Sequence, residues 1–217
     1  MTPIKLMTRN CMTAFALPLT LLLVLSLTVP AAHAQQKPDE IVKEAVDRVR
    51  GLIEENAETY RSDPNAFYKM VDEEIVPNFD MPYITRLVLA RHAREASNEQ
   101  RRRFAVAFKN MLVRTYADAM LEYNDAVQTE WAPLRMAADA DQATVQSRLL
   151  REDGPPIPIG FVMHKVDAGW KIYDITVEGL SLVTNFRAQF NQEIRANGLD
   201  ALIQKMESRD FKPELEG

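Results

Sequence analysis

The stretch GWKIYDITVEGLSLVTNFRAQF, Gly169–Phe190, predicts a strand, a tight turn and a helix in direct succession. Trp170–Val177 is rich in β-branched and aromatic residues, as strands are, and Glu178-Gly179 has the chemistry of a turn. Val183, Phe186 and Phe190 then recur at the spacing of one helix face. Such a unit often carries an enzyme's nucleophile, but here its single serine, Ser181, lacks a G-x-S-x-G frame. We therefore interpret Ser181 as the cap of the helix that follows.

Three further strands are predicted upstream, at Val127–Met136, Thr144–Arg151 and Ile157–Val166. The loops between them are short and contain turn residues, such as Asp153-Gly154-Pro155-Pro156. Strands joined by short loops pair with their sequence neighbours, so the four strands form an antiparallel meander.

Helical periodicity dominates the rest of the chain. Capping and proline signals place helix starts at Pro38, at Asp63-Pro64, at Asp80 and at Ser97, where S-N-E-Q is a capping box. The predicted helices end near Tyr60, Ile75, Val88 and Tyr123; two more run from Ser181 to Asn197 and over Leu199–Ser208, before a frayed tail from Phe211. Helices, then strands, then helices predict an α+β fold with helices packed on one face of a four-stranded antiparallel sheet.

Residues 1–34 are expected to be a cleaved secretory signal peptide. Lys5 and Arg9 precede an apolar run over Ala14–Val29, and Ala32-His33-Ala34 has the small-x-small pattern of a cleavage site. Residues 35–217 would then form a single domain with room for two lobes, one of helices (38–123 and the C-terminal helices) and one of strands (127–177). Cys11, the only cysteine, lies in the removed segment, so the mature chain would have no disulfide or thiolate site.

The composition disfavours several classes of function. Removing Lys5 and Arg9 takes the formal net charge from −5 to −7, which argues against nucleic-acid binding. His92 and His164 lie on different elements and do not make a metal cluster, and the chain has no phosphate-binding glycine motif. The run Arg101–Arg103 is interpreted as a solvated helix face, with an acidic partner or a phosphate as the alternative.

Four stretches resemble the MlaC family, also called the toluene-tolerance family: "FD" at Phe79-Asp80, "RTYADAMLEY" at Arg114–Tyr123, the opening stretch, and "GLDALI" at Gly198–Ile203. The resemblance covers nearly all of the mature chain. It implies a bent antiparallel sheet distantly like the cone of nuclear transport factor 2. It also implies a periplasmic phospholipid carrier of the Mla pathway, exported by the general secretory route, that supports outer-membrane lipid asymmetry.

The same resemblance implies two partners and no enzyme activity. The partners are an inner-membrane ATP-driven lipid transporter complex and an outer-membrane lipoprotein–porin complex. Phospholipid would be cargo, and no cofactor is expected. The acyl tails would lie between sheet and helices, on these predicted lipid-binding residues: Tyr83, Leu87, Phe108, Leu112, Tyr116, Ile159, Phe161, Tyr173, Ile175, Val183, Phe186 and Phe190. Arg114 and Arg187 are candidates for a lipid phosphate, with surface ion pairs as the equal alternative.

Two other functions stay open from the residues alone. A small enzyme of cone-like fold could use Asp80 with Tyr83, or Tyr173 with Asp174, for acid–base chemistry in an apolar pocket. Against this, Asp80 is expected to cap a helix and Glu178 to shape a turn. The second alternative is a periplasmic adaptor with a filled core, for which Arg101–Arg103 would be the partner surface.

Overall fold

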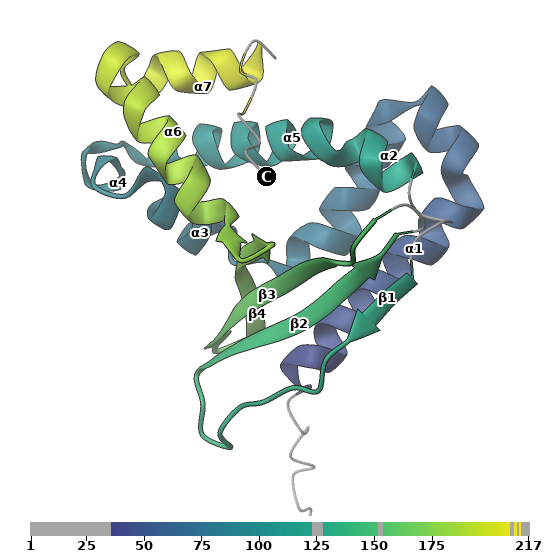
Figure 1. Ribbon diagram of the computed structural model, residues 1–217. Coiled ribbons are helices and arrows are strands. Elements are labelled where there is room, and N and C mark those ends of the chain that lie inside the picture. Colours follow the sequence, from purple (N-terminus) through teal and green to yellow (C-terminus); the bar gives the residue numbers. More distant parts are fainter. Residues whose placement is uncertain (1–35, 123–127, 152–153, 209–210, 212, 214–217) are drawn as a thin grey trace, which may run out of the picture. The chain divides into compact units, whose positions relative to one another are not determined.

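The computed structural model describes residues 36–122, 128–151, 154–208, 211 and 213 (Figure 1). The predicted signal peptide lies outside these residues, as do Tyr123 and Val127, where a predicted helix ends and a predicted strand begins.

The first half of the described chain is helical. Its elements are α1 (Pro38–Ser62), α2 (Pro64–Met70), the π-helix η1 (Val71–Ile75), the 3₁₀ turn η2 (Val76–Asn78), α3 (Met81–Leu89), α4 (His92–Glu95) and α5 (Asn98–Glu122). The predicted caps are confirmed: Asp63 accepts from the Asn65 N–H at 3.0 Å and Asp80 from the Tyr83 N–H at 2.9 Å. Ser97 and Gln100 form the reciprocal capping box in front of α5.

The sheet has five strands in the order β1-β2-β3-β4-β5, and each neighbouring pair is antiparallel, so the predicted meander is confirmed. The strands are β1 (Gln128–Trp131), β2 (Gln142–Leu150), β3 (Ile157–Val166), β4 (Gly169–Val177) and β5 (Leu180–Ser181). The prediction of a first strand extending to Met136 is wrong, because pairing with β2 ends at Trp131.

The fifth strand was not predicted. Glu178 (φ 52°) and Gly179 (φ 86°) both have positive φ, which a two-residue hairpin turn of type I′ requires. The turn folds Leu180-Ser181 back onto Val177 and Thr176 before the next helix begins. The predicted turn is therefore a hairpin turn and not a direct passage from strand to helix.

Two helices follow, α6 (Leu182–Asn197) and α7 (Leu199–Glu207). The Ser181 hydroxyl accepts from the Thr184 N–H at 3.0 Å, so Ser181 is the predicted cap of α6. Gly198, at φ 86°, makes the corner between α6 and α7. Beyond α7 the prediction of a tail frayed from Phe211 is wrong for Phe211 itself, whose ring lies 5.3 Å from that of Phe190 and packs against the helices.

The buried side chains form three separate clusters within this α+β fold. The helical cluster joins α3, α5, α6 and α7 and includes Phe104, Phe108, Phe186, Phe190 and Leu202. The sheet cluster packs α1 on β2, β3 and β4 and includes Val42, Val145, Met163, Trp170 and Ile172. The third cluster joins the second half of α1, α2, η1 and α5, and includes Ile53, Phe67, Met70, Val71 and Val113. A single domain more often has one contiguous core.

Candidate functional site

One face of the sheet is mostly apolar, with the buried Ser147 as a polar residue on it. The register pairs Phe161 with Val145 and with Ile175, and it pairs Ile159 with Val177, so the predicted residues Ile159, Phe161 and Ile175 share this face. At the end nearest Trp170 the face is covered by α1 and belongs to the sheet cluster. At the other end Ile159 and Val177 are only partly buried.

The register adds residues that the sequence prediction left out. Leu149 pairs with Ile157, and both lie on the same face as Ile159 and Val177. Among the described residues these four apolar side chains are partly exposed and belong to none of the three clusters. Strand parity could have found them, because Ile157 and Ile159 are two residues apart, as are Ile175 and Val177.

Helix α5 lies across from the partly exposed end of the sheet face (Figure 1). The first half of α1 packs on the sheet, whereas its second half packs with α5. On the other flank, α3 contacts both β4 and α5 (Figure 1). Helix α5 makes its extensive contacts with α7, α3 and α1. Of these three helices, α1 and α3 also contact the sheet, so they connect α5 to the sheet on two flanks.

Leu112 and Tyr116 are the predicted site residues on α5 that are only partly buried. They are four residues apart and therefore lie on one face of the helix. Burial raises the pKa of the Tyr116 hydroxyl. Apolar side chains thus remain incompletely covered both on α5 and on the sheet.

Four predicted residues lie in a closed environment instead. Phe108, Val183, Phe186 and Phe190 are 2%, 7%, 1% and 0% exposed. The ring of Phe108 lies 5.1 Å from that of Phe186 and 5.4 Å from that of Phe190, in edge-to-face contacts. These residues fill the helical cluster, and Leu87 packs against its surface.

The remaining predicted residues, Tyr83 and Tyr173, meet on the opposite side of the sheet from Phe161. Tyr83 stacks on His164 at 4.6 Å and meets the Tyr173 ring edge-on at 5.4 Å. The pairing of β3 with β4 shifts after Val162, which leaves Tyr173 between the paired residues Ile172 and Asp174. This bulge turns Tyr173 toward His164, so simple alternation does not predict its face.

The two carboxylates of the enzyme alternative are both held by structural hydrogen bonds. Asp80 accepts from the Tyr83 N–H and lies 3.0 Å from His164 Nε2, which ties α3 to β3. Asp174 accepts from the Ser181 hydroxyl at 2.5 Å and from the Val183 N–H at 3.0 Å, which ties β4 to the start of α6. The predicted role of Asp80 as a helix cap is confirmed.

The two arginines considered for a lipid phosphate bind helix ends. Arg114 Nη2 donates to the Met206 carbonyl in the last turn of α7 at 2.8 Å. Arg187 Nε donates to the Leu87 carbonyl in the last turn of α3 at 2.8 Å. Both cations therefore satisfy carbonyl groups where the helix dipole is negative.

Neither a metal site nor a membrane span emerges from the part of the chain that the structure describes. Over these residues, no three His, Cys, Asp or Glu side chains gather closely enough to hold a metal ion. No helix within the same ranges is both long enough and apolar enough to cross a bilayer.

Comparison with known proteins gives consistent matches. The sequence model of the MlaC protein family matches residues 43–208. The chain is 30% identical over 168 residues to the toluene tolerance protein ttg2D of Pseudomonas putida, covering 77% of each chain. It is 26% identical over 199 residues to the intermembrane phospholipid transport system binding protein MlaC of Haemophilus influenzae, covering 90% of this chain and 92% of that one.

A solved structure is also similar. It is the phospholipid-binding protein of Ralstonia solanacearum in complex with a phospholipid, with a TM-score of 0.73 and 30% sequence identity. The match covers 80% of this chain and 97% of that one.

Proposed function

This chain belongs to the MlaC family, and from that membership we propose that it is a phospholipid-binding carrier of the Mla pathway. The observation that carries the proposal is the similar fold of a protein of 30% identity that holds a phospholipid. The separation of the buried residues into three clusters supports it, since a carrier needs apolar surface that its own side chains do not fill.

The physical need for such a carrier is large. Each methylene hidden from water contributes about 0.8 kcal/mol, so two tails with roughly 28 methylenes cost on the order of 20 kcal/mol to expose. A protein that crosses an aqueous compartment with a phospholipid must therefore cover the tails, and it need catalyse nothing.

The tails are proposed to lie between α5 and the apolar face of the sheet. Ile159, Phe161 and Ile175 would contact them from the sheet, and Leu112 and Tyr116 from α5, together with the newly added Leu149, Ile157 and Val177. Leu87 would line the edge near β4. Tyr83 and Tyr173, which lie on the other side of the sheet, would support β3 and β4 from behind. Phe108, Val183, Phe186 and Phe190 would support this site from behind as a closed wall.

The location and the partners are proposed from what is known of the family. The proposed carrier is exported with loss of residues 1–34, works in the periplasm, and exchanges lipid with an inner-membrane transporter complex and an outer-membrane lipoprotein–porin complex. It has no enzyme activity or cofactor. Accordingly, Asp80→Asn, which keeps an acceptor oxygen for the cap of α3, is expected to leave the amount of bound phospholipid unchanged.

Native mass spectrometry with solvent extraction of the purified protein tests the proposal. The wild-type chain should carry the mass of a phospholipid, and Ile159→Trp should lose most of it because the indole occupies the space of the tails. Leu180→Trp is the matched control, since Leu180 is 56% exposed on β5 and has room for a larger side chain. A wild-type protein of bare polypeptide mass that takes no lipid from vesicles would overturn the proposal.

A further inference from the structure

The charges of the helical half of the chain are strongly separated. Residues 39–74, from α1 to η1, carry eleven acids and five bases, a net charge of −6. Residues 86–114, from α3 to α5, carry eight bases and two acids, a net charge of +6. A protein that is acidic overall therefore has one strongly basic region, and such a region attracts an acidic surface over several ångströms.

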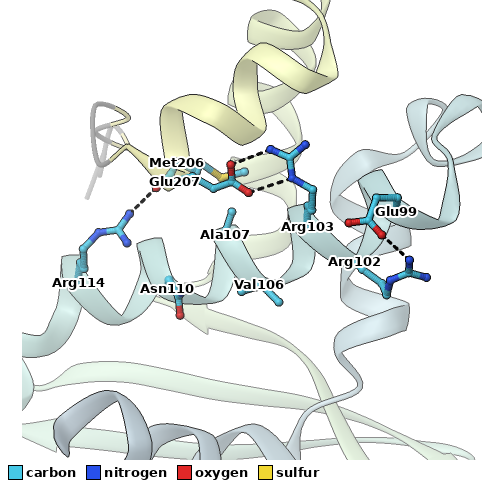
Figure 2. A pocket seen from close by; sticks show the side chains of 9 residues that line it. All are labelled: Glu99, Arg102, Arg103, Val106, Ala107, Asn110, Arg114, Met206 and Glu207. Atoms are coloured by element: carbon cyan, nitrogen blue, oxygen red, sulfur yellow. Dashed lines mark hydrogen bonds and ion pairs between the residues drawn. The ribbon is translucent and has the colours of Figure 1, made fainter. Parts of the chain in front are cut away.

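A surface hollow lies within the basic region, between α5 and α7, and Figure 2 shows the side chains around it. Its volume is about 380 Å³. Ala107 and Met206 close its base but are buried, with 2% and 0% of their surface exposed, whereas Val106 at its side is 55% exposed. We call this feature the α5–α7 hollow.

Three arginines surround the α5–α7 hollow, and each is held in place. Arg103 forms a two-pronged ion pair with Glu207 of α7, at 2.8 and 3.2 Å. Arg114 is held by the Met206 carbonyl, and Arg102 pairs with Glu99 one turn away. Cations that are already ordered lose little conformational entropy when a partner binds.

For three other arginines of the basic region, the interactions seen within the described residues are not with carboxylates. Arg101 donates to the carbonyls of Ala93 and Ala96, both at 2.7 Å, and Arg91 to the Asn191 side chain at 3.3 Å. Arg86 lies over the Tyr83 ring. Their positive charge is not neutralised by these contacts, so it adds to the field around the hollow.

We propose that the α5–α7 hollow is the docking surface for an acidic protein partner, which places one apolar side chain against Val106 and its carboxylates beside Arg102 and Arg114. The concave shape favours a protein over a bilayer surface, because a flat layer of headgroups does not enter a hollow between two helices, whereas a protruding side chain does. An apolar anchor ringed by charges is the usual anatomy of a protein interface.

This inference rests on the proposed function for the identity of the partner. A carrier exchanges its cargo while docked on a donor and on an acceptor, so at least one of the two membrane complexes should present an acidic surface with an apolar side chain. The hollow is formed by α5 and α7, whereas the proposed tail site lies between α5 and the sheet. Docking and cargo can therefore be tested separately.

The test measures binding of the purified chain to each purified complex, the inner-membrane transporter and the outer-membrane lipoprotein–porin complex, at low and high salt. Arg102→Glu and Val106→Asp should each weaken binding to at least one complex by about tenfold or more, and wild-type binding should weaken as salt rises. Arg135→Glu is the matched control, because Arg135 is an exposed arginine in the β1–β2 connection and undergoes the same charge change.

Two further measurements make the result decisive. Circular dichroism should give the same melting temperature for wild type and for Val106→Asp, since Val106 is exposed, and native mass spectrometry should find the same bound phospholipid in every variant. Equal binding of all variants to both complexes would overturn the docking proposal while leaving the carrier function standing. No binding by the wild type to either complex would overturn the docking proposal and the proposed partners together. Binding of the wild type only to phosphatidylglycerol vesicles would overturn it in favour of a membrane surface. If native mass spectrometry found no phospholipid on the purified wild-type protein, that result would instead count against the carrier function.

Discussion

Thr85 of α3 is buried, with 3% of its surface exposed, and its hydroxyl oxygen has no hydrogen-bond partner among the described residues. A buried polar group without a partner costs about 1–3 kcal/mol. Thr85→Val removes the hydroxyl while retaining the branched shape, and we expect it to raise the free energy of unfolding by about 1 kcal/mol. Urea denaturation followed by circular dichroism measures this change.

Thr115 provides the control for this substitution. It is also a helical threonine, but its hydroxyl donates to the Met111 carbonyl at 2.9 Å. Thr115→Val should therefore not stabilise the protein. If Thr85→Val were destabilising, the Thr85 hydroxyl would have a favourable partner in solution, and the stated reason would be wrong.

Glu193 gives a prediction about pH. Hydrogen bonds from Lys205 of α7 and from Asn197 hold the pKa of the Glu193 carboxyl below its ordinary value. A lowered pKa in the folded state means that the contribution to stability is complete above the pKa of the unfolded chain and is lost as the pH falls through the folded pKa. The contribution is small, because Lys205 is 45% exposed and the pair is screened by solvent.

We therefore expect Glu193→Gln to lower the free energy of unfolding by less than about 1 kcal/mol at neutral pH. The difference from wild type should disappear in acid, below the lowered pKa of the carboxyl. Urea midpoints of both proteins over a pH series measure this. A difference that persisted in acid would show that the amide disturbs the packing of α6 on α7 and that the ion pair is not the cause.

At the scale of elements, the helical cluster and the proposed tail site should respond differently to truncation. Phe186 is enclosed by Phe108 and Phe190, so Phe186→Ala leaves a cavity and should cost about 3–5 kcal/mol. Ile159 is only partly buried and stands outside the three clusters, so in the lipid-free protein Ile159→Ala should cost less than the 2–5 kcal/mol usual for a core isoleucine. Denaturation of delipidated protein compares the two, and equal losses would mean that Ile159 is an ordinary core residue.

Local sequence signals predicted most of the elements. The caps at Asp63, Asp80, Ser97 and Ser181 act through hydrogen bonds within a few residues, and each was placed correctly. The strand over Ile157–Val166 was also correct to the residue. The two-residue strand β5 was missed because two residues are too few for a period, and pairing with β4 depends on the positive φ of Glu178.

The candidate site was harder to predict for a physical reason. Phe108 and Leu112 of α5 are separated by one helical turn, yet Phe108 is enclosed and Leu112 is only partly buried. A periodic stripe gives the face of a helix but not whether that face meets other side chains or empty space. For the strands, the bulge that turns Tyr173 away from Ile175 breaks the alternation from which a face is assigned.

For the whole molecule, the three clusters of buried side chains hold the fold together, and the proposed tail site lies outside them. The helical cluster is tightly packed with aromatic rings, and the sheet cluster and the third cluster are joined to each other through α1. On the sheet face opposite α5, Leu149, Ile157, Ile159 and Val177 are only partly buried and belong to none of the three clusters. A bound acyl chain would cover these side chains, so cargo and fold stability should be linked.

Removal of the phospholipid is therefore expected to destabilise the protein. A ligand that binds only the folded state stabilises it by about 2.7 kcal/mol when its free concentration is 100 times its Kd. For a domain of this size, a loss of that order should lower the melting temperature by several degrees or more. Thermal unfolding of the loaded protein and of the same protein after delipidation measures the effect, and reloading from vesicles should restore it. Ile159→Trp separates cargo from other effects of the treatment: with most of its lipid already absent, its melting temperature should change little on delipidation. If wild type and Ile159→Trp shifted equally, the stabilisation would not come from lipid bound between α5 and the sheet.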